Sequence, residues 1–255
     1  MSQWFDLSGK TAVIAGGTST LGRSMAEALA AHGAQVAIIG RKADVAAEVV
    51  AQLAEAGGEA QAFLGDMTEE RDIERVHAEV MQRYGKVEVL LYCPGVNSAT
   101  PFFELEMEEW DHIMNVNVKG AIRMCQQFGQ SMIGGGGGSI ILISSVSSDP
   151  PLSRVFTYSM SKASLNSMTK YLAREFAPHG VRVNAIIPGF FPAEQNRAIL
   201  SPERVEAIMR HTPMGRFGAP EELQGTAVWL ASERASGFVT GALIRVDGGF
   251  GAMTI

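Results

Sequence analysis

One stretch near the N-terminus indicates the fold, the run Thr11-Ala-Val-Ile-Ala-Gly-Gly-Thr-Ser-Thr-Leu-Gly22. Its first five residues are apolar or β-branched, which is typical of a strand buried on both faces of a sheet. Two glycines follow where that strand ends, and a helical pattern begins near Leu21. A strand, a glycine turn and a helix in this order predict the first half of a βαβ unit.

The same alternation of strand and helix continues to the end of the chain. The expected strands are Thr11–Ala15, Gln35–Ile39, Ala60–Leu64, Val87–Tyr92, Ser139–Ile143, Val181–Ile187 and Ala242–Val246. Between them lie segments with apolar residues at helical spacing, such as Leu21–His32, Asp44–Ala56, Glu69–Tyr84 and Thr157–Pro178. This order predicts an α/β fold, a doubly wound parallel sheet of about seven strands with helices on both faces.

Composition limits the class of protein. The chain has 255 residues and a net charge of −6, which argues against nucleic acid as a partner. There is no apolar run long enough for a membrane span and no signal-peptide pattern, so we expect a cytoplasmic protein. The two cysteines, Cys93 and Cys125, suggest neither a disulfide framework nor a zinc site. With no linker or repeat, residues 1–255 are predicted to form a single domain.

Glycine is more frequent than usual, at 28 of 255 residues. Five of these glycines form the run 134–138 directly before an expected strand. No lysine follows the run as a phosphate-binding P-loop requires, so we interpret it as a slack connection.

The first glycine turn is a candidate pyrophosphate site. Glycine at the strand end lets the backbone approach a phosphate, and the helix that follows offers free N–H groups and a positive dipole end. The residues expected there are Gly16, Thr18, Ser19, Thr20, Leu21 and Gly22. Their spacing is not G-x-G-x-x-G, so an ordinary glycine turn remains the alternative.

The end of the second strand bears on the choice of nucleotide. Gly40 stands where a carboxylate would bind a ribose 2′-hydroxyl, and Arg41 follows, placed to bind a 2′-phosphate. Arg23 is positioned to add positive charge, although Arg41 and Lys42 can equally be a solvated helix start. We therefore expect NADP(H), with NAD(H) left open. Asp66, after the third strand, can accept from the adenine amino group or can cap the next helix.

The sequence Tyr158-Ser-Met-Ser-Lys162 is the strongest local indication of catalytic residues. At positions i and i+4 of a helix, the phenol and the ammonium group lie on one face. A nearby cation lowers the pKa of a phenol, which predicts a general acid or base for a carbonyl–alcohol pair.

Two further side chains support this chemistry. Ser145 lies just beyond the strand Ser139–Ile143, where its hydroxyl can bond a substrate oxygen, and the adjacent Ser144 should point the other way. Asn117 lies inside a helix that begins near Glu108, where an amide is unfavourable, so a local kink holding a water is one interpretation and a satisfied buried amide is the other.

The sequence contains no motif typical of metal-dependent catalysis or of serine hydrolases. The five histidines are scattered without the spacing of a metal site, and there is no G-x-S-x-G nucleophile. His211 is expected to be structural, and Arg216 to anchor its own loop.

Taken together and in this order, these residues resemble the short-chain dehydrogenase/reductase family over about Phe5 to Phe250. Further matches are Val181-Arg-Val-Asn184-Ala-Ile-Ile-Pro188-Gly189 and Val246-Asp247-Gly248-Gly249. The resemblance implies a Rossmann-type fold, a nicotinamide cofactor, no metal and a homotetramer or homodimer. It implies catalytic roles for Asn117, which would hold a proton-relay water, and for Ser145, Tyr158 and Lys162, with Lys162 also binding the nicotinamide ribose. It also implies cofactor contacts by Met67, Gly95, Pro188, Gly189 and Phe191.

The chain departs from the family pattern at three places. The middle glycine of the first turn is Thr20, the usual N-N-A-G reads Tyr92-Cys-Pro-Gly95, and Ala193 replaces a threonine that commonly binds the carboxamide.

The segment of about 190–217 resembles a sugar-acid branch of the family, the fructuronate reductases (mannonate oxidoreductases) and gluconate 5-dehydrogenases. Arg154 and Arg197 can pair with a substrate carboxylate, and Asn97, Gln195 and Asn196 can bind hydroxyls, although each can equally be a surface residue.

We therefore predict an NAD(P)-dependent oxidoreductase acting on a polar carbonyl or secondary alcohol, a keto-sugar acid or related polyol. The alternatives are a 3-oxoacyl thioester reductase and a non-catalytic nucleotide-sensing protein.

Overall fold

The computed structural model describes residues 3–192 and 200–253 of the chain. Its centre is one sheet of seven parallel strands in the order β3-β2-β1-β4-β5-β6-β7. The strands are β1 (Thr11–Ala15), β2 (Gln35–Gly40), β3 (Glu59–Leu64), β4 (Val89–Tyr92), β5 (Gly138–Ile143), β6 (Val181–Pro188) and β7 (Leu243–Val246). The order reverses beside β1, which opens a crevice between β1 and β4 at the carboxyl ends of the strands.

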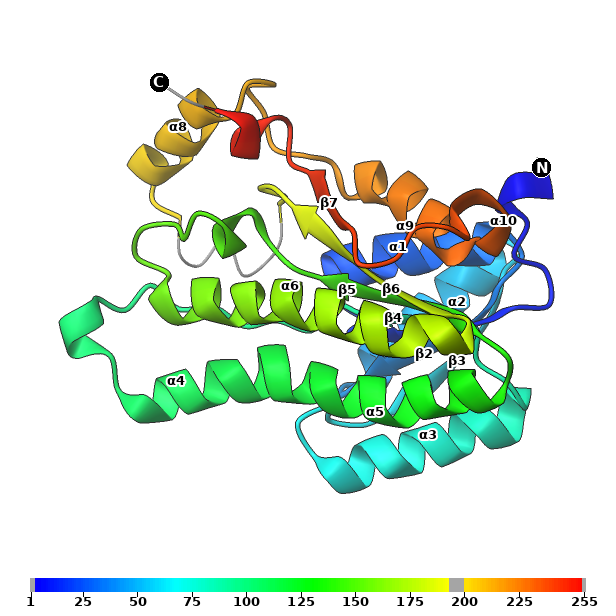
Figure 1. Cartoon of the computed structure of the whole chain (residues 1–255). Coiled ribbons are helices and arrows are strands. Elements are labelled where there is room, and N and C mark those ends of the chain that lie inside the picture. The colour runs from blue at the N-terminus through cyan, green and yellow to red at the C-terminus, as the bar shows by residue number, and fades with distance from the viewer. Residues whose placement is uncertain (1–2, 193–199, 254–255) are drawn as a thin grey trace.

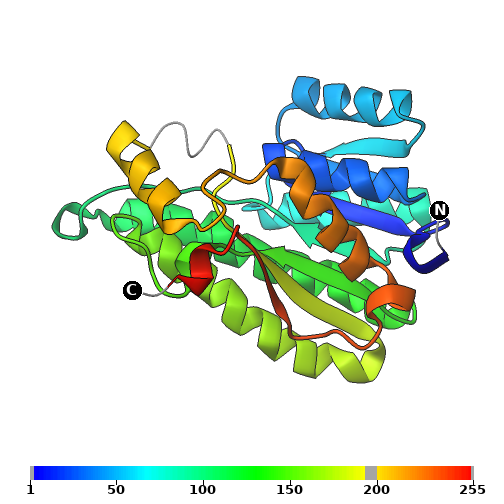
Figure 2. The same cartoon turned by 90° about the horizontal axis from the view of Figure 1, so that it is seen from above.

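Helices cover both faces of this sheet (Figure 1, Figure 2). They are α1 (Thr20–Ala31), α2 (Ala43–Glu55), α3 (Glu70–Tyr84), α4 (Met107–Met114), α5 (Gly120–Gly134), α6 (Phe156–Phe176), α8 (Pro202–His211), α9 (Gln224–Ala231) and α10 (Glu233–Ser236). A π-helical turn, Asn115–Lys119, joins α4 to α5 without a break. The predicted Rossmann-type α/β fold is confirmed.

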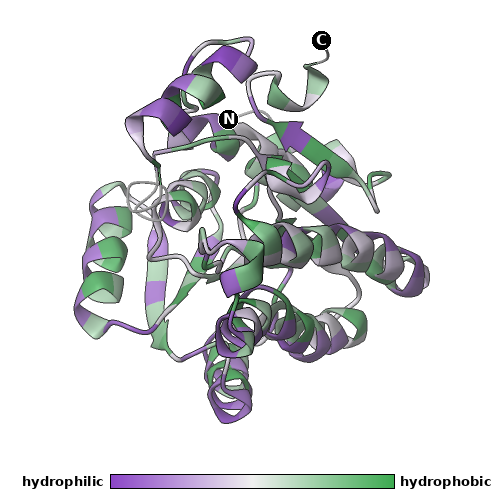
Figure 3. Cartoon of the chain, turned by 90° about the vertical axis from the view of Figure 1, so that its left-hand side faces the viewer, coloured by the Kyte–Doolittle hydropathy of each residue, from purple (hydrophilic) through white to green (hydrophobic). Residues whose placement is uncertain are grey.

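The core consists of two apolar layers, one on each side of the sheet. Alternate residues of a strand point to opposite faces, so Ala12 and Ile14 of β1 pack with α1, α2 and α9, whereas Val13 and Ala15 pack with α3, α5 and α6. Hydrophobic residues of the helices pack against the sheet, whereas hydrophilic residues lie mostly on the outer side of the helices (Figure 3).

The outer strands differ from the expectation of strands buried on both faces. Residues of β3 alternate between exposed and half-buried over much of their length, and those of β7 are half-buried or exposed, because each strand lies at an edge of the sheet. The fourth strand is also shorter than predicted and begins at Val89, although Val87 is buried.

Three smaller features bear on the sequence predictions. The glycine run 134–138 spans the end of α5, a turn and the first residue of β5, as expected of a connection. Cys93 and Cys125 are free thiols. Among the helices described, none combines the length and the apolar character that crossing a bilayer requires.

Candidate active site

A cavity of about 780 Å³ lies at the carboxyl ends of the central strands. Its walls come from the segments that follow β1, β2, β4, β5 and β6, together with α6 and the first turn of α8. This is the place where open parallel sheets bind their ligands.

Most of the predicted site residues line this cavity. They are Thr18, Ser19, Thr20, Leu21, Arg41, Gly95, Asn97, Ser145, Arg154, Tyr158, Lys162, Pro188, Gly189 and Phe191. Gly16, Gly22, Asp66, Met67 and Asn117 do not form part of its wall. The predictions for Ala193, Gln195, Asn196 and Arg197 fall outside the described residues.

The turn after β1 presents the N-terminus of α1 to the cavity. Ser19 caps this helix, its hydroxyl accepting a hydrogen bond from the N–H of Gly22 at 3.2 Å. The first-turn N–H groups of Thr20 and Leu21 have no acceptor within the helix. Both residues line the cavity, so the donor set fits a pyrophosphate.

The adenosine end of the cavity has no room for a side chain at position 40. A Cβ on Gly40 would lie 2.7 Å from the Cγ2 methyl of Thr18, so an acidic residue there would collide with the glycine turn. Arg41 follows, 70% exposed, with its guanidinium 3.4 Å from a carboxylate oxygen of Asp66. An exposed pair of this kind is weak, so Arg41 can exchange Asp66 for a phosphate.

Asp66 is not the N-cap of the next helix, because that position belongs to Glu69. Its carboxylate instead accepts hydrogen bonds from the backbone N–H and the hydroxyl of Thr68, at 2.9 and 2.8 Å. Although burial acts to raise the pKa of Asp66, these bonds hold it below its ordinary value. The group therefore stays an acceptor.

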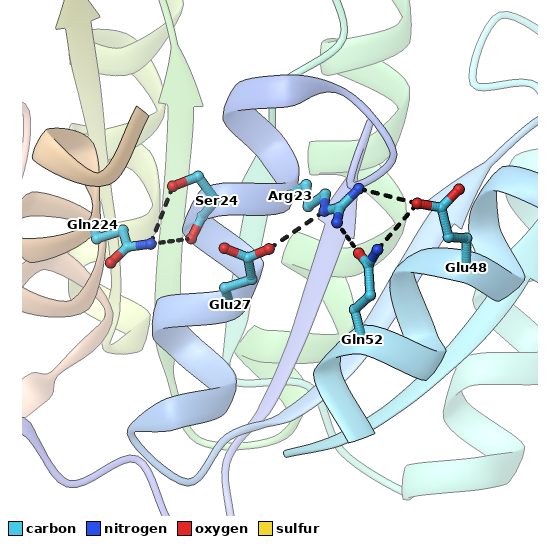
Figure 4. Close-up of polar contacts among 6 residues, drawn as sticks. All are labelled: Arg23, Ser24, Glu27, Glu48, Gln52 and Gln224. Carbon is cyan, nitrogen blue, oxygen red and sulfur yellow. Dashed lines mark hydrogen bonds and ion pairs between the residues drawn. The ribbon is translucent and has the colours of Figure 1, made fainter. Parts of the chain in front are cut away.

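Arg23 does not supply the free charge that the sequence suggested. Its guanidinium bridges α1 and α2, contacting Glu27 at 3.3 Å, Glu48 at 3.6 Å and the side-chain oxygen of Gln52 (Figure 4). Its positive charge is therefore already matched by two carboxylates. On the other side of α1, Gln224 donates to Ser24, which ties α1 to α9.

Tyr158 and Ser145 lie together on the substrate side of the cavity. Ser145 is the cap of a short 3₁₀ turn after β5, and its hydroxyl forms a hydrogen bond with the phenol of Tyr158. The neighbouring Ser144 points elsewhere, its hydroxyl donating to the backbone carbonyl of Lys162 at 3.1 Å. The structure therefore pairs Ser145, and not Ser144, with the phenol.

Lys162 is 2% exposed, and its Nζ lies 5.6 Å from the centre of the Tyr158 ring. Nζ donates to the carbonyl of Ile143 at 2.9 Å. Burial lowers the pKa of Lys162 to about 8 and raises that of Tyr158 to about 12. In the chain by itself the pKa of the phenol therefore lies above its ordinary value and not below it as predicted, because burial outweighs the hydrogen bond from Ser145.

Asn117 lies in the π turn and is completely buried. Its amide nitrogen donates to the carbonyl of Val96 at 3.0 Å and to the hydroxyl of Ser161 at 2.9 Å, and its amide oxygen accepts from the N–H of Val96 at 2.8 Å. The expected irregularity of the helix is present. The side chain is the satisfied buried amide of the alternative interpretation, so its N–H groups are not available to a water.

Two arginines form part of the substrate side of the cavity wall. Arg154 has a left-handed backbone with φ of 71°, which is rare for a residue other than glycine and frequent at functional sites. Arg204, in the first turn of α8, donates to the hydroxyl and the carbonyl of Ser153, at 2.8 and 3.1 Å. Sequence reasoning missed Arg204, because nothing local shows that α8 lies against the loop before α6.

The remaining predictions concern residues away from this chemistry. Arg216 donates to both carboxylate oxygens of Glu222, at 2.6 and 2.7 Å, and so anchors its own loop. The ring of His211 packs against Phe250 with the ring centres 4.5 Å apart, as expected of a structural residue. No cluster of metal-binding side chains occurs within residues 3–192 and 200–253.

Known proteins match this chain along almost its whole length. A family model described as enoyl-(acyl carrier protein) reductase matches residues 15–251. Uncharacterized oxidoreductase UxuB of Bacillus subtilis is 38% identical, covering 96% of each chain. NAD-dependent glycerol dehydrogenase of Listeria innocua is 36% identical, covering 96% of this chain and 95% of its own. The crystal structure of a gluconate 5-dehydrogenase from Burkholderia cenocepacia, in complex with NADP and tartrate, is 31% identical, with a TM-score of 0.94 over 98% of each chain.

One family assignment accounts for all of these findings: the crevice at the carboxyl ends of the strands, the arrangement of Ser145, Tyr158 and Lys162, and the similarity to these proteins. The chain belongs to the short-chain dehydrogenase/reductase family and is an NAD(P)-dependent oxidoreductase of the CH–OH/C=O class.

Proposed function

We propose that the protein interconverts a carbonyl and a secondary alcohol on a substrate that carries a carboxylate, a keto-sugar acid of the fructuronate or mannonate type or a related polyol acid. The observation that carries this proposal is the pair Arg154 and Arg204. Both line the cavity that also contains Tyr158, and neither forms an ion pair with another described residue.

Charge balance supports an anionic substrate. Elsewhere on the cavity wall the arginines are compensated, Arg23 by Glu27 and Glu48 and Arg41 by Asp66. Arg204 uses two of its N–H groups on Ser153 and keeps others for a ligand. Guanidinium groups bind carboxylates with two parallel hydrogen bonds, which gives both affinity and orientation. The resemblance to a gluconate 5-dehydrogenase points in the same direction.

The proposed chemistry divides among four residues. A bound nicotinamide supplies or accepts the hydride. Tyr158 gives its proton to the carbonyl oxygen in reduction and takes one from the alcohol in oxidation. Ser145 holds the same oxygen by a hydrogen bond, Lys162 binds the nicotinamide ribose and adds positive charge near the phenol, and Asn117 fixes the surrounding loop and α6.

For the cofactor, we propose a preference for NADP(H). The absence of an acidic residue at position 40, the space taken there by Thr18 and the exposed Arg41 support a 2′-phosphate. Arg41→Ala should raise the KM for NADPH about tenfold and leave the KM for NADH unchanged, because only NADPH carries the phosphate. A strong preference of the unchanged protein for NADH would contradict this.

The substrate proposal is tested with a panel of keto-uronates, keto-gluconates, uncharged sugars and polyols, and acyl thioesters, each offered with NADPH and NADH. Arg204→Ala should raise the KM for the acids about tenfold and leave that for uncharged substrates unchanged. Arg210→Ala is the matched control, since Arg210 lies on the same helix outside the cavity wall. Turnover of acyl thioesters alone, or an equal effect of Arg204→Ala on charged and uncharged substrates, would overturn the proposal.

We further propose that residues 1–255 work as one domain, that the segment of about 190–217 contributes to substrate binding, and that the protein is a cytoplasmic homotetramer. The two free thiols suit a reducing compartment. Exposed apolar side chains on α5 and α6, among them Ile122, Met160 and Tyr171, support association with further copies.

A further inference from the structure

Tyr92 is a buried tyrosine that the chemistry above does not use. It is the last residue of β4 and is 1% exposed. Its hydroxyl donates to the backbone carbonyl of Val116 at 2.6 Å. Burial raises the pKa of Tyr92 far above its ordinary value, so this hydroxyl remains a donor at every working pH.

The acceptor belongs to the π turn between α4 and α5. In a π turn the backbone bonds skip one residue more than in an α-helix, and here the N–H of Gly120 donates to the carbonyl of Asn115. Such single turns leave the regular hydrogen-bond ladder and need other partners. Tyr92 supplies one from the neighbouring strand.

Gly120 makes this contact sterically feasible. A Cβ at position 120 would lie 2.4 Å from the hydroxyl oxygen of Tyr92 and 2.7 Å from the carbonyl oxygen of Met67. Any larger residue would push the phenol away from Val116. The tyrosine and the glycine, 28 positions apart, therefore form one arrangement around the turn.

The residue after Val116 is Asn117, whose amide holds Val96 and Ser161. Ser161 in turn donates to the backbone carbonyl of Tyr158 at 2.7 Å. A continuous series of contacts thus runs from the hydroxyl of Tyr92 through the π turn to the backbone of the residue that exchanges the proton. Lys162, one residue beyond Ser161, flanks the same loop at Gly95.

We infer that Tyr92 is a positioning residue for the reaction: its hydroxyl fixes the π turn, and through Asn117 it sets where Tyr158 and Lys162 lie relative to the cavity. The inference depends on the oxidoreductase class and not on which carbonyl compound is the substrate.

The test is Tyr92→Phe, which keeps the buried ring and removes only the hydroxyl. Turnover should fall about tenfold, since small misplacements at a reacting centre are costly, while the Kd for NADPH stays within about twofold. The pH at which alcohol oxidation reaches half its maximal rate should move upward, because the phenol and lysine are less well placed to support a phenolate. The matched control is Tyr84→Phe, which removes a buried hydroxyl that has no hydrogen-bond partner among the described residues. It should leave turnover and the pH profile unchanged.

A second measurement needs no substrate. Amide hydrogen exchange can be followed by mass spectrometry. In Tyr92→Phe, exchange should become about tenfold faster in the peptides that cover Asn115–Lys119 and the start of α6. In Tyr84→Phe, exchange in both peptides should stay unchanged. Faster exchange spread over the whole sheet, with loss of NADPH binding, would show a merely structural tyrosine and overturn the inference. Unchanged exchange and an unchanged pH profile would overturn it as well. Because this measurement uses no substrate, its result does not depend on whether the substrate proposal is correct.

Discussion

At the scale of single residues, the site depends on one phenol held in its neutral form. Ser145 bonds to Tyr158, and Lys162 lies buried behind it with its ammonium on the carbonyl of Ile143. Because burial raises the pKa of Tyr158 to about 12, the group carries its proton throughout the physiological range. This state suits a proton donor to a carbonyl oxygen.

Removing the phenol oxygen should therefore abolish most of the turnover without preventing nucleotide binding. We expect Tyr158→Phe to lower turnover by about 10²–10⁴-fold, the usual contribution of a general acid, and to leave nucleotide affinity within a few-fold. Initial rates and a fluorescence titration with NADPH measure the two effects separately. Retention of turnover within tenfold of the unchanged protein would refute the role given to Tyr158.

Lys162 should determine the pH dependence of reduction. Its pKa is lowered to about 8, so the positive charge is present below that pH and is lost as the pH rises through it, while Tyr158 remains protonated to about pH 12. The kcat/KM for carbonyl reduction should thus be flat below pH 8 and fall above it. In Lys162→Arg, whose side chain stays charged, the fall should move to higher pH. A decline that begins well below pH 8 would assign the titration to another group.

At the level of secondary-structure elements, the N-terminus of the helix after β1 contributes both to the stability of the fold and to the proposed nucleotide site. Ser19→Ala removes the cap on Gly22 and should lower the free energy of unfolding by about 1 kcal/mol. It should also lower the affinity for NADPH and for NADH by the same factor, because both nucleotides carry the pyrophosphate that the helix N-terminus is expected to bind. Urea unfolding and nucleotide titrations measure these effects.

Ser201→Ala is the matched control for that experiment. Ser201 caps α8 in the same way, its hydroxyl accepting from the N–H of Arg204 at 3.3 Å. This variant should lose similar stability and bind both nucleotides normally. A change in the ratio of NADPH to NADH affinity in Ser19→Ala would contradict the assignment of the turn to the pyrophosphate.

At the scale of the whole molecule, apolar side chains remain on the outer surface of α5 and α6. Tyr171 is 57% exposed on α6, and Ile122 on α5 is 42% exposed. If these faces meet in a homotetramer, a charge introduced there must be taken out of water, which is costly. Tyr171→Glu should therefore reduce the molar mass measured by light scattering.

Phe238→Glu provides the comparison, because Phe238 is fully exposed and lies outside α5 and α6. It should leave the molar mass unchanged. A monomeric mass for the unchanged protein would contradict the proposed assembly directly.

The order of the elements and the local groups of functional residues can be predicted from the sequence. The strand period and the glycine turn are local properties, and so is the i, i+4 spacing of Tyr158 and Lys162 on one helix. Each requires only residues within a few positions of one another. For this reason the α/β order, which implies a parallel sheet, and the pairing of Tyr158 with Lys162 on one helix face can be predicted from the sequence.

The contacts between distant residues, in contrast, depend on tertiary packing. Arg204 reaches Ser153 across 51 positions, Asn117 joins Val96 to Ser161, and Tyr92 reaches the π turn at Val116. The tertiary structure also shows that Arg23 is already paired and that burial raises the pKa of Tyr158. Charge compensation, loss of solvent and steric clearance depend on neighbours that sheet order and helix packing bring together, and no local sequence pattern encodes these neighbours.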